Sequence, residues 1–244
     1  MRPWPTRFGP SKLTPHDDRC GQRRKRRRRG GLSGSVLWRG VDLWHVPTTL
    51  VAMVDSAHGG KTAVNLGRAK NQLGTFYPAH RVYICEDLLA TLPIAQRRQG
   101  FVELIKGLWL GEPQIVLALE PSQVERIVSA PFAEIRDLLF PLLDAAIGVK
   151  HDIVARDPHE KRGIRTFLNF GHTMAHALEL YCALDHGSAV AWGNGDGGPC
   201  PVKHGQMSQD EAHRLYQHDL SSLCVIHPME LPSDDQIVEG AHAG

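Results

Sequence analysis

The sequence lacks any apolar run close to the roughly 20 residues that a membrane-spanning helix needs, which argues against an integral membrane protein. It has only five cysteines among 244 residues, and they form neither a CxxC pair nor a tight framework. An odd, scattered set of this kind favours reduced thiols and a cytoplasmic location. The first ten residues carry no apolar stretch behind their charges, so no secretory leader is expected.

What is present is an ordinary globular composition, with 42% hydrophobic and 22% charged residues. It excludes a wholly disordered, collagen-like or coiled-coil protein, and the length suggests one or two domains. The net charge of +2 conceals 12 Lys and Arg against 2 Asp and Glu in residues 1–40, and 16 against 24 in the remainder. The basic pI therefore describes the N-terminal segment and not the body of the chain.

Seven consecutive basic residues, Arg23–Arg29, dominate this segment. Like charges in a row repel one another and resist packing, so residues 1–35 are expected to be a disordered basic segment. A nucleic-acid interface is the alternative interpretation, and a mobility shift that is lost on deleting residues 1–30 would support it. No aromatic residues interleave for base stacking, so nucleic acid is not expected as a partner.

The patterning changes near residue 95 and predicts strands before that point and helices after it. Val41–Val46 alternates apolar and polar residues, and Arg81–Cys85 is a second strand candidate. Leu50–Val54 is a short apolar run, and the residues between Asp55 and Gly74 have the Gly, Lys and Asn content of a ligand-cradling loop. We therefore predict an α/β domain in residues 36–95.

The second predicted domain, residues 96–244, is helical, with an atypical tail after residue 193. Apolar residues recur at helical spacing, and Asp157-Pro158 should end the helix before it. A further helix is predicted for Thr173–Leu184, and a capping box favours one at Ser208–Tyr216. The helical repeats comprise Phe101, Leu104, Ile105 and Leu108, then Val124, Ile127 and Val128, and then Leu138, Leu139, Leu142 and Leu143.

Histidines provide the strongest chemical motif. His172 and His176 share one face of a helix, and His186 follows ten residues later. Imidazoles at this spacing suit Zn²⁺ or a similar divalent ion, although an isolated HxxxH is more often a surface or core feature. A zinc protease requires Glu directly after the first histidine, where Thr173 stands, so metal-assisted peptide hydrolysis is not favoured.

Two further motifs carry charge. Gly59-Gly60-Lys61-Thr62 has the glycines and the lysine of an anion site but lacks the first glycine of a Walker A loop. A solvated turn is its structural alternative. Glu103 and Lys106 share one face of an apolar helix, as either a functional pair or a structural ion pair.

Five sequence blocks in order resemble those of the 3-dehydroquinate synthase family, over roughly residues 38–193. They are residues 46–62 (VPTTLVAMVDSAHGGKT), 70–76 (KNQLGTF), 103–106 (ELIK), 165–176 (RTFLNFGHTMAH) and 186–191 (HGSAVA). The resemblance implies α/β plus all-α architecture: an NAD-binding α/β domain, here truncated, followed by a helical metal-binding domain. It also implies conversion of 3-deoxy-D-arabino-heptulosonate 7-phosphate to 3-dehydroquinate and phosphate in the shikimate pathway.

By the same resemblance, the cofactors are NAD and a divalent metal, Zn or Co, and a homodimer is suggested. The implied metal ligands are Glu103, His172 and His186, which leaves His176 to face the substrate in proton transfer. A lyase of this type binds a small phosphorylated sugar acid and has no membrane partner. The implied substrate residues are Lys61, Asn71, Lys106, Arg165 and Asn169, and the implied cofactor residues are Thr48, Thr49, Asp55, Lys70 and Thr91.

The chain also departs from the family pattern. Only residues 30–35 (GGLSGS) resemble the glycine-rich nucleotide block, with Ser35 at the position of its aspartate, and the strands expected upstream are missing. After Gly193 a Gly- and Pro-rich stretch replaces an apolar helix, and a later Asp-Lys-Lys segment is absent. Ser188 stands where the family has Glu, and there is one extra residue between Asp157 and Gly163.

These departures leave three alternatives open. Besides an active 3-dehydroquinate synthase, the sequence allows an inactive fragment or degenerate copy of that enzyme, another sugar phosphate cyclase, or a non-catalytic protein that keeps the helical domain for stability or partner contact. Arg165 and Asn169 match the dehydroquinate type at positions where the other cyclases differ. Tight binding of NAD would argue against the non-catalytic alternative.

Overall fold

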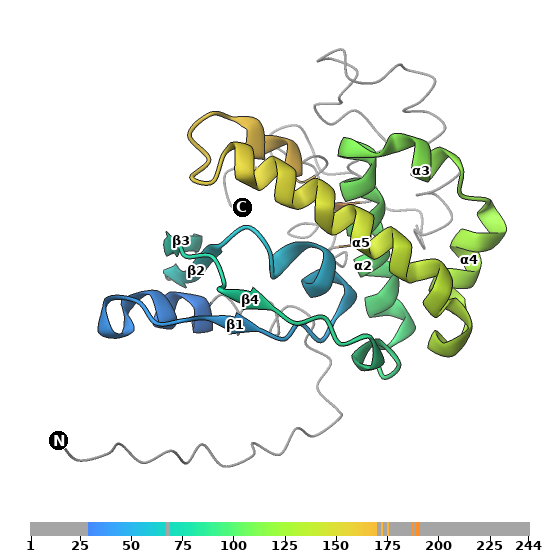
Figure 1. The fold of residues 1–244 in the computed structure, drawn as a ribbon, viewed down its shortest axis with the longest axis horizontal. Helices are drawn as coiled ribbons and strands as arrows, with labels where there is room; N and C mark the ends of the chain where they lie inside the picture. The colour runs from blue at the N-terminus through green and yellow to red at the C-terminus, as the bar shows by residue number, and fades with distance from the viewer. Residues whose placement is uncertain are drawn as a thin grey trace.

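Two long helices, α2 (Ile94–Gly111) and α5 (Phe132–Arg156), pack against each other and form the centre of the structure (Figure 1). The structure is a computed structural model that describes residues 29–66 and 69–169, and single residues at positions 172, 175, 187, 189 and 190. Two shorter helices, α3 (Pro113–Leu117) and α4 (Pro121–Ser129), connect them. The predicted helical repeats are confirmed, and α5 ends before Asp157-Pro158 as expected.

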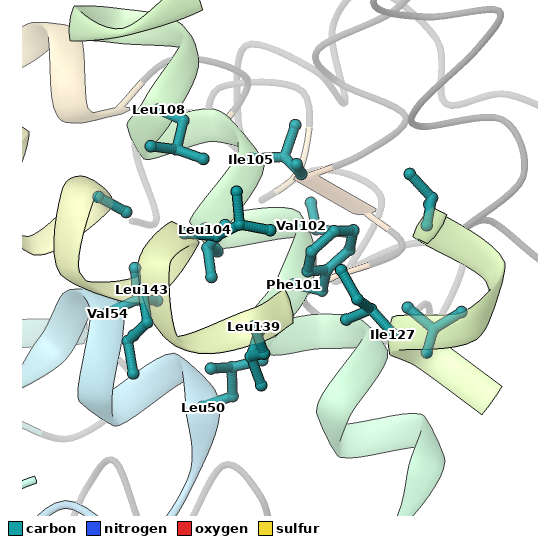
Figure 2. Packing of buried hydrophobic residues seen from close by; sticks show 14 of the residues in the cluster. Leu50, Val54, Phe101, Val102, Leu104, Ile105, Leu108, Ile127, Leu139 and Leu143 are labelled. Atoms are coloured by element: carbon teal, nitrogen blue, oxygen red, sulfur yellow. The ribbon is translucent and has the colours of Figure 1, made fainter. Parts of the chain in front are cut away.

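The core consists of the apolar faces of these helices. Phe101, Leu104, Ile105 and Leu108 of α2 are fully buried, as the helical spacing predicted. They pack with Ile127 of α4, with Leu139 and Leu143 of α5 and with Leu50 and Val54 of the first domain (Figure 2). One continuous core therefore joins the strand-containing part and the helical part.

A glycine in α2 permits the close approach of these two parts. A Cβ atom at Gly100 would lie 2.4 Å from Leu50 Cβ and 2.7 Å from the Val51 nitrogen. Gly148 in α5 is the matched control, because a Cβ atom there meets nothing within 4 Å. We expect Gly100→Ala to destabilise the fold by about 1–3 kcal/mol through overpacking, and Gly148→Ala to stabilise it by about 0.5–1 kcal/mol. Urea unfolding at neutral pH measures both, and equal effects would contradict the packing argument.

The strands form two small separate sheets in the described part of the chain. β1 (Trp44–His45) pairs in parallel with β4 (Arg81–Val82). β2 (Lys61–Leu66) pairs in antiparallel with β3 (Ala69–Phe76), with a register shift between Val64 and Leu66. The strands predicted at 41–46 and 81–85 are confirmed only in part, because only two residues of each segment lie in a strand. The fold class, a truncated α/β part followed by helices, is confirmed.

Three expectations for the first domain are wrong. The segment between Asp55 and Gly74 is mostly the β2–β3 hairpin and not a loop, because Thr62 and Thr75 pair across it with side-chain oxygens 2.8 Å apart. Residues 50–56, placed among the strands, are helical and include the wide turn η2 (Ala52–Ser56). Residues 29–36, mostly assigned to the disordered segment, form a helix whose Gly31 lies against Thr62.

Short 3-10 turns complete the described fold. They are η1 (Leu37–Arg39), η3 (Glu86–Leu89) and η4 (Ile164–Asn169), the last of which follows α5 after a short loop. The remainder of the predicted basic segment, the helix predicted at 173–184 apart from Ala175, the helix predicted at 208–216 and the atypical tail lie outside the described residues. Within the residues that are described, no helix combines the length and apolar character that a membrane crossing requires.

Candidate active site

A buried carboxylate on α2 forms the centre of the candidate site. The side chain of Glu103 is 1% exposed, and its Oε2 lies 2.6 Å from Lys106 Nζ one helical turn later. The i,i+3 spacing that the sequence showed therefore does place the two charges together. His172 approaches from the segment after η4, with its Nε2 3.8 Å from Glu103 Oε1. The Lys106 ammonium also donates to the Leu168 carbonyl, 2.9 Å away.

This donor set fits a divalent metal ion. A carboxylate oxygen and an imidazole nitrogen are typical zinc ligands, and two ligands of one ion at about 2 Å from it lie roughly 3–4 Å apart. The 3.8 Å between Glu103 and His172 falls in this range. Among described residues no group of three possible ligands converges, since the third predicted ligand, His186, lies outside them. Its neighbour Gly187 is buried, and a Cβ atom there would lie 2.5 Å from Gln99 Cα, one turn before Glu103 on α2.

A second ion pair lies beside the first. Lys150 on α5 donates to the Asp55 carboxylate, which the sequence placed near the cofactor. Burial lowers the pKa of the Lys150 ammonium, an effect that Asp55 opposes, and the charges of Lys106 and Glu103 also act on it. Sequence analysis missed Lys150. A lysine on the buried face of an otherwise apolar helix was the available signal.

Two histidines pack behind this pair. His58 Nε2 lies 2.7 Å from the Met53 carbonyl, which accepts only, so Nε2 carries the proton. His58 Nδ1 therefore accepts from His151 Nε2–H at 2.9 Å, with the two rings edge to face. The pKa of His58 is lowered to about 4, mainly by burial; His151 and Lys150 contribute to the lowering, and the Met53 and Asp55 oxygens oppose it. His58 is thus a neutral hydrogen-bonded side chain near neutral pH.

Arg165 joins η4 to the turn before β2. Its guanidinium is buried and donates to the Gly59 carbonyl at 2.9 Å and to the Pro158 carbonyl at 2.8 Å. Burial lowers the pKa of Arg165 while Glu160, Asp157 and Asp55 raise it. The guanidinium also lies over the Phe76 ring, 5.5 Å from its centroid.

Asp157, which sequence analysis used only as a helix end, orders the loop before η4. Burial raises the pKa of its carboxyl, but backbone N–H donors from Arg162, Lys161, Arg165 and Ile164 outweigh burial and lower it overall. The nearest of these donors, the Lys161 N–H, is 2.8 Å away. An aspartate followed by proline at a helix end was the signal for this role.

Lys61 begins β2 and is paired with Glu160, whose two carboxylate oxygens lie 2.7 and 2.6 Å from Nζ. Glu160 carries a positive φ of 56° and was not predicted as a site residue. Arg165 reaches the Gly59 carbonyl two residues before Lys61. Two of the predicted anion-binding residues, Arg165 of η4 and Lys61 of β2, are therefore brought near each other at the Gly59–Lys61 turn.

The other predicted residues occupy varied positions. Thr49 is buried, and its hydroxyl accepts from the Ala52 N–H at 3.3 Å, which caps the helical segment 50–56. Thr48 is exposed. Thr91 is also exposed, and its hydroxyl donates to the Leu88 carbonyl at 3.3 Å. Asn71 is exposed in β3 at φ 56°, and its backbone N–H donates to Asn65 Oδ1.

Three positions complete the set. Asn169 ends η4, next to the Leu168 carbonyl that binds Lys106. Lys70 lies in β3, but its side chain is outside the described part of the structure, and so is the whole of His176. The candidate site contains three ion pairs: Glu103 with Lys106, Asp55 with Lys150 and Glu160 with Lys61.

Solved structures with the same fold are sugar phosphate cyclases. A 2-epi-5-epi-valiolone synthase from Streptomyces hygroscopicus subsp. jinggangensis 5008, with NAD+ and Zn2+ bound, matches at a TM-score of 0.69 and 25% identity, over 86% of this chain and 58% of that one. A 2-deoxy-scyllo-inosose synthase complexed with carbaglucose-6-phosphate, NAD+ and Co2+ matches at a TM-score of 0.68 and 26% identity, over 88% and 57%. Fold and site thus define a protein of the sugar phosphate cyclase class.

Sequence comparison identifies the family within that class. Family models described as 3-dehydroquinate synthase N-terminal and 3-dehydroquinate synthase C-terminal match residues 29–99 and 100–234. The 3-dehydroquinate synthase of Microcystis aeruginosa (strain NIES-843 / IAM M-2473) is 38% identical over 188 residues, 75% of this chain and 50% of that protein. That of Geobacter metallireducens (strain ATCC 53774 / DSM 7210 / GS-15) is 36% identical over 205 residues, 83% and 54%. The chain belongs to the 3-dehydroquinate synthase family, and it spans about half the length of these curated relatives.

Proposed function

We propose that this chain acts as a 3-dehydroquinate synthase: an NAD- and metal-dependent lyase that converts 3-deoxy-D-arabino-heptulosonate 7-phosphate to 3-dehydroquinate and phosphate. The observation that carries the proposal is the buried Glu103 carboxylate with Lys106 at 2.6 Å and His172 at 3.8 Å. A carboxylate at 1% exposure needs positive charge beside it, and an imidazole next to it supplies the second donor of a metal site.

Glu103, His172 and His186 would hold the divalent ion, Zn²⁺ or Co²⁺. When bound, the ion would polarise the oxygen of a substrate alcohol and NAD would accept a hydride, two functions that amino-acid side chains do not supply. Lys106 has a separate task in this scheme. Its ammonium, fixed by Glu103 and by the Leu168 carbonyl, holds one orientation toward an anionic substrate.

The cationic groups would bind the charged substrate. Lys61, Lys150 and Arg165 come from three different elements and supply three cationic groups, which suits a ligand with both a carboxylate and a phosphate. Asn71 and Asn169 would contact hydroxyl groups. His176 would transfer a proton at its imidazole to or from the substrate.

The cofactor residues are proposed from the same family likeness. Asp55, Thr48, Thr49, Lys70 and Thr91 would face the nucleotide or order its loop. Thr49 has support from its geometry, because its hydroxyl fixes the start of the 50–56 helical segment that carries Asp55. Asp55 in turn is held by Lys150, so the proposed cofactor and substrate regions share one ion pair.

Elemental analysis and phosphate release test the proposal together. We expect about one zinc or cobalt ion per purified wild-type chain and none in His172→Ala, because a metal site loses most of its affinity when a ligand is removed. With the heptulosonate phosphate, NAD and Co²⁺ or Zn²⁺, wild type should release phosphate and His172→Ala should not. Metal in both proteins would refute the ligand assignment, and no release above blank from metal-loaded wild type would refute the activity.

We further propose a homodimer and a cytoplasmic location. Support for a dimer comes from family likeness and from Val36, Leu37 and Trp38, consecutive apolar residues that are all exposed. Support for the location comes from the scattered cysteines, of which the described Cys85 is a free thiol. Light scattering of the purified chain tests the dimer.

A non-catalytic role is the second candidate, favoured by the small sheets of the described residues. The described strands make two separate two-stranded sheets. A parallel nucleotide-binding sheet normally has several strands. Calorimetric titration with NAD separates the two roles, because tight binding favours the enzyme and its absence favours the non-catalytic protein.

A further inference from the structure

The loop of residues 157–163, here called the Asp157 loop, is held rigidly next to the start of β2. The Asp157 carboxylate accepts the backbone N–H groups of Lys161 at 2.8 Å and Ile164 at 3.1 Å. Arg165 ties the loop to the first domain by donating to both Pro158 and Gly59 carbonyls. The extra residue relative to the family pattern falls within this same loop.

Glu160 stands in this loop in a conformation that a non-glycine residue rarely adopts, with φ 56°. Its two carboxylate oxygens lie 2.7 and 2.6 Å from Lys61 Nζ. Backbone strain of this kind persists only where the surroundings impose it, and it gathers at functional positions. The anchors at Asp157 and Arg165 impose it here, and they aim a carboxylate at Lys61.

Charge decides what this contact does. Lys61 is 40% exposed and Glu160 25%, so the ion pair is accessible from solvent and weak enough to exchange. An anionic group that approaches Lys61 meets the negative charge of Glu160 and must replace it or lie beside it. Breaking the ion pair and placing two negative charges side by side both cost free energy, and neither cost would arise if residue 160 were neutral.

We propose that Glu160 is an internal competitor of the anionic ligand for Lys61, a latch that occupies the lysine until a phosphate or carboxylate replaces it. The identity of the ligand rests on the proposed function, but the latch itself rests on the Lys61–Glu160 contact. Release of the latch breaks only this ion pair. The Asp157 anchors and the edge-to-face contact of His159 with Phe76, at 5.6 Å, remain in place.

The latch is tested first without any ligand, by the rate at which an acetylating ester modifies Lys61, read by mass spectrometry. Glu160→Gln removes the charge, and Glu160→Gly also relieves the positive φ and so protects against a folding failure. Glu86→Gln is the matched control, because Glu86 is 27% exposed and pairs with Arg136 away from the site. We expect acetylation of Lys61 to rise about three- to five-fold in both Glu160 variants and to stay unchanged in Glu86→Gln.

Ligand binding is the second measurement, by calorimetry with inorganic phosphate and with the heptulosonate phosphate. Removal of the competing charge should tighten binding about three- to five-fold in Glu160→Gln and leave it unchanged in Glu86→Gln. Weaker or unchanged binding in Glu160→Gln, or an unchanged acetylation rate, would overturn the latch. If phosphate binds and the sugar acid phosphate does not, the proposed function fails while the phosphate titration still decides the latch. If neither anion binds any variant, the competition does not exist and the latch is overturned too.

Discussion

When the pH falls from 7.5 to 4.5, wild type is expected to lose about 2–3 kcal/mol more of its free energy of unfolding than His58→Gln loses. Burial lowers the pKa of His58 from 6.5 to about 4. In the unfolded chain the imidazole takes up a proton below pH 6.5, whereas in the folded protein it does so only near pH 4. The unfolded state therefore binds more protons across this window, and the free energy of unfolding falls as the pH falls from 6.5 to 4.

Urea unfolding of both proteins at pH 7.5 and 4.5 measures this difference. Titrating groups that do not interact with His58 act in wild type and variant alike, so the comparison reports on His58 together with its neighbours His151, Lys150 and Asp55. His80→Gln is the control, because His80 is an exposed histidine on the outside of the first domain. If His58→Gln loses as much stability as wild type between pH 7.5 and pH 4.5, His58 is not a buried neutral imidazole bonded to Met53 and His151, and the inference is contradicted.

Replacing Lys106 by methionine is the second change with a large expected effect. Methionine fills similar space but leaves the Glu103 carboxylate, at 1% exposure, without its ammonium. Breaking a buried pair by removing one partner costs about 3–5 kcal/mol, because the remaining charge stays in a poorly solvating environment. We expect metal-free Lys106→Met to lose about this much stability, and saturating Zn²⁺ to restore a part of it, because an ion bound at Glu103 and His172 supplies positive charge.

A double variant separates pairing from packing. Glu103→Leu together with Lys106→Met removes both charges and should cost less than Lys106→Met alone, measured by denaturant unfolding without metal. Arg136→Met, which breaks the exposed pair with Glu86, should change stability little. Equal losses in the single and double variants would mean that Lys106 matters for packing and not for its charge.

The local part of the site followed from the sequence. Apolar residues at helical spacing predict α2, and the same spacing places Glu103 and Lys106 on one face of it. His172 was identified as a metal ligand by family likeness, and its 3.8 Å approach to Glu103 is consistent with that role, which stays a proposal. Helical periodicity is a local property, so one sequence is enough to predict it.

Other features could not be predicted from residue patterns. The Gly, Lys and Asn content between residues 55 and 74 suggested a loop. In the structure β2 and β3 form a hairpin there, in which Thr62 and Thr75 are paired and their hydroxyl groups are hydrogen-bonded to each other. Residues 29–35 were predicted to belong to the disordered basic segment, yet a helix forms over 29–36, with Gly31 closely packed against Thr62. Both structures depend on contacts with residues that are distant in sequence, which residue patterns along the chain do not show.

By itself, the sequence determined the family, the helical second part and the residue types of a metal and anion site, since these depend on order and spacing along the chain. Only the tertiary structure decided which charges meet. Lys150 reaches Asp55 from 95 residues away, Lys61 meets Glu160 across 99, and His58 meets His151 across 93. Buried charges must be paired or they cost free energy, and the packing of α5 against the first domain selects the partners.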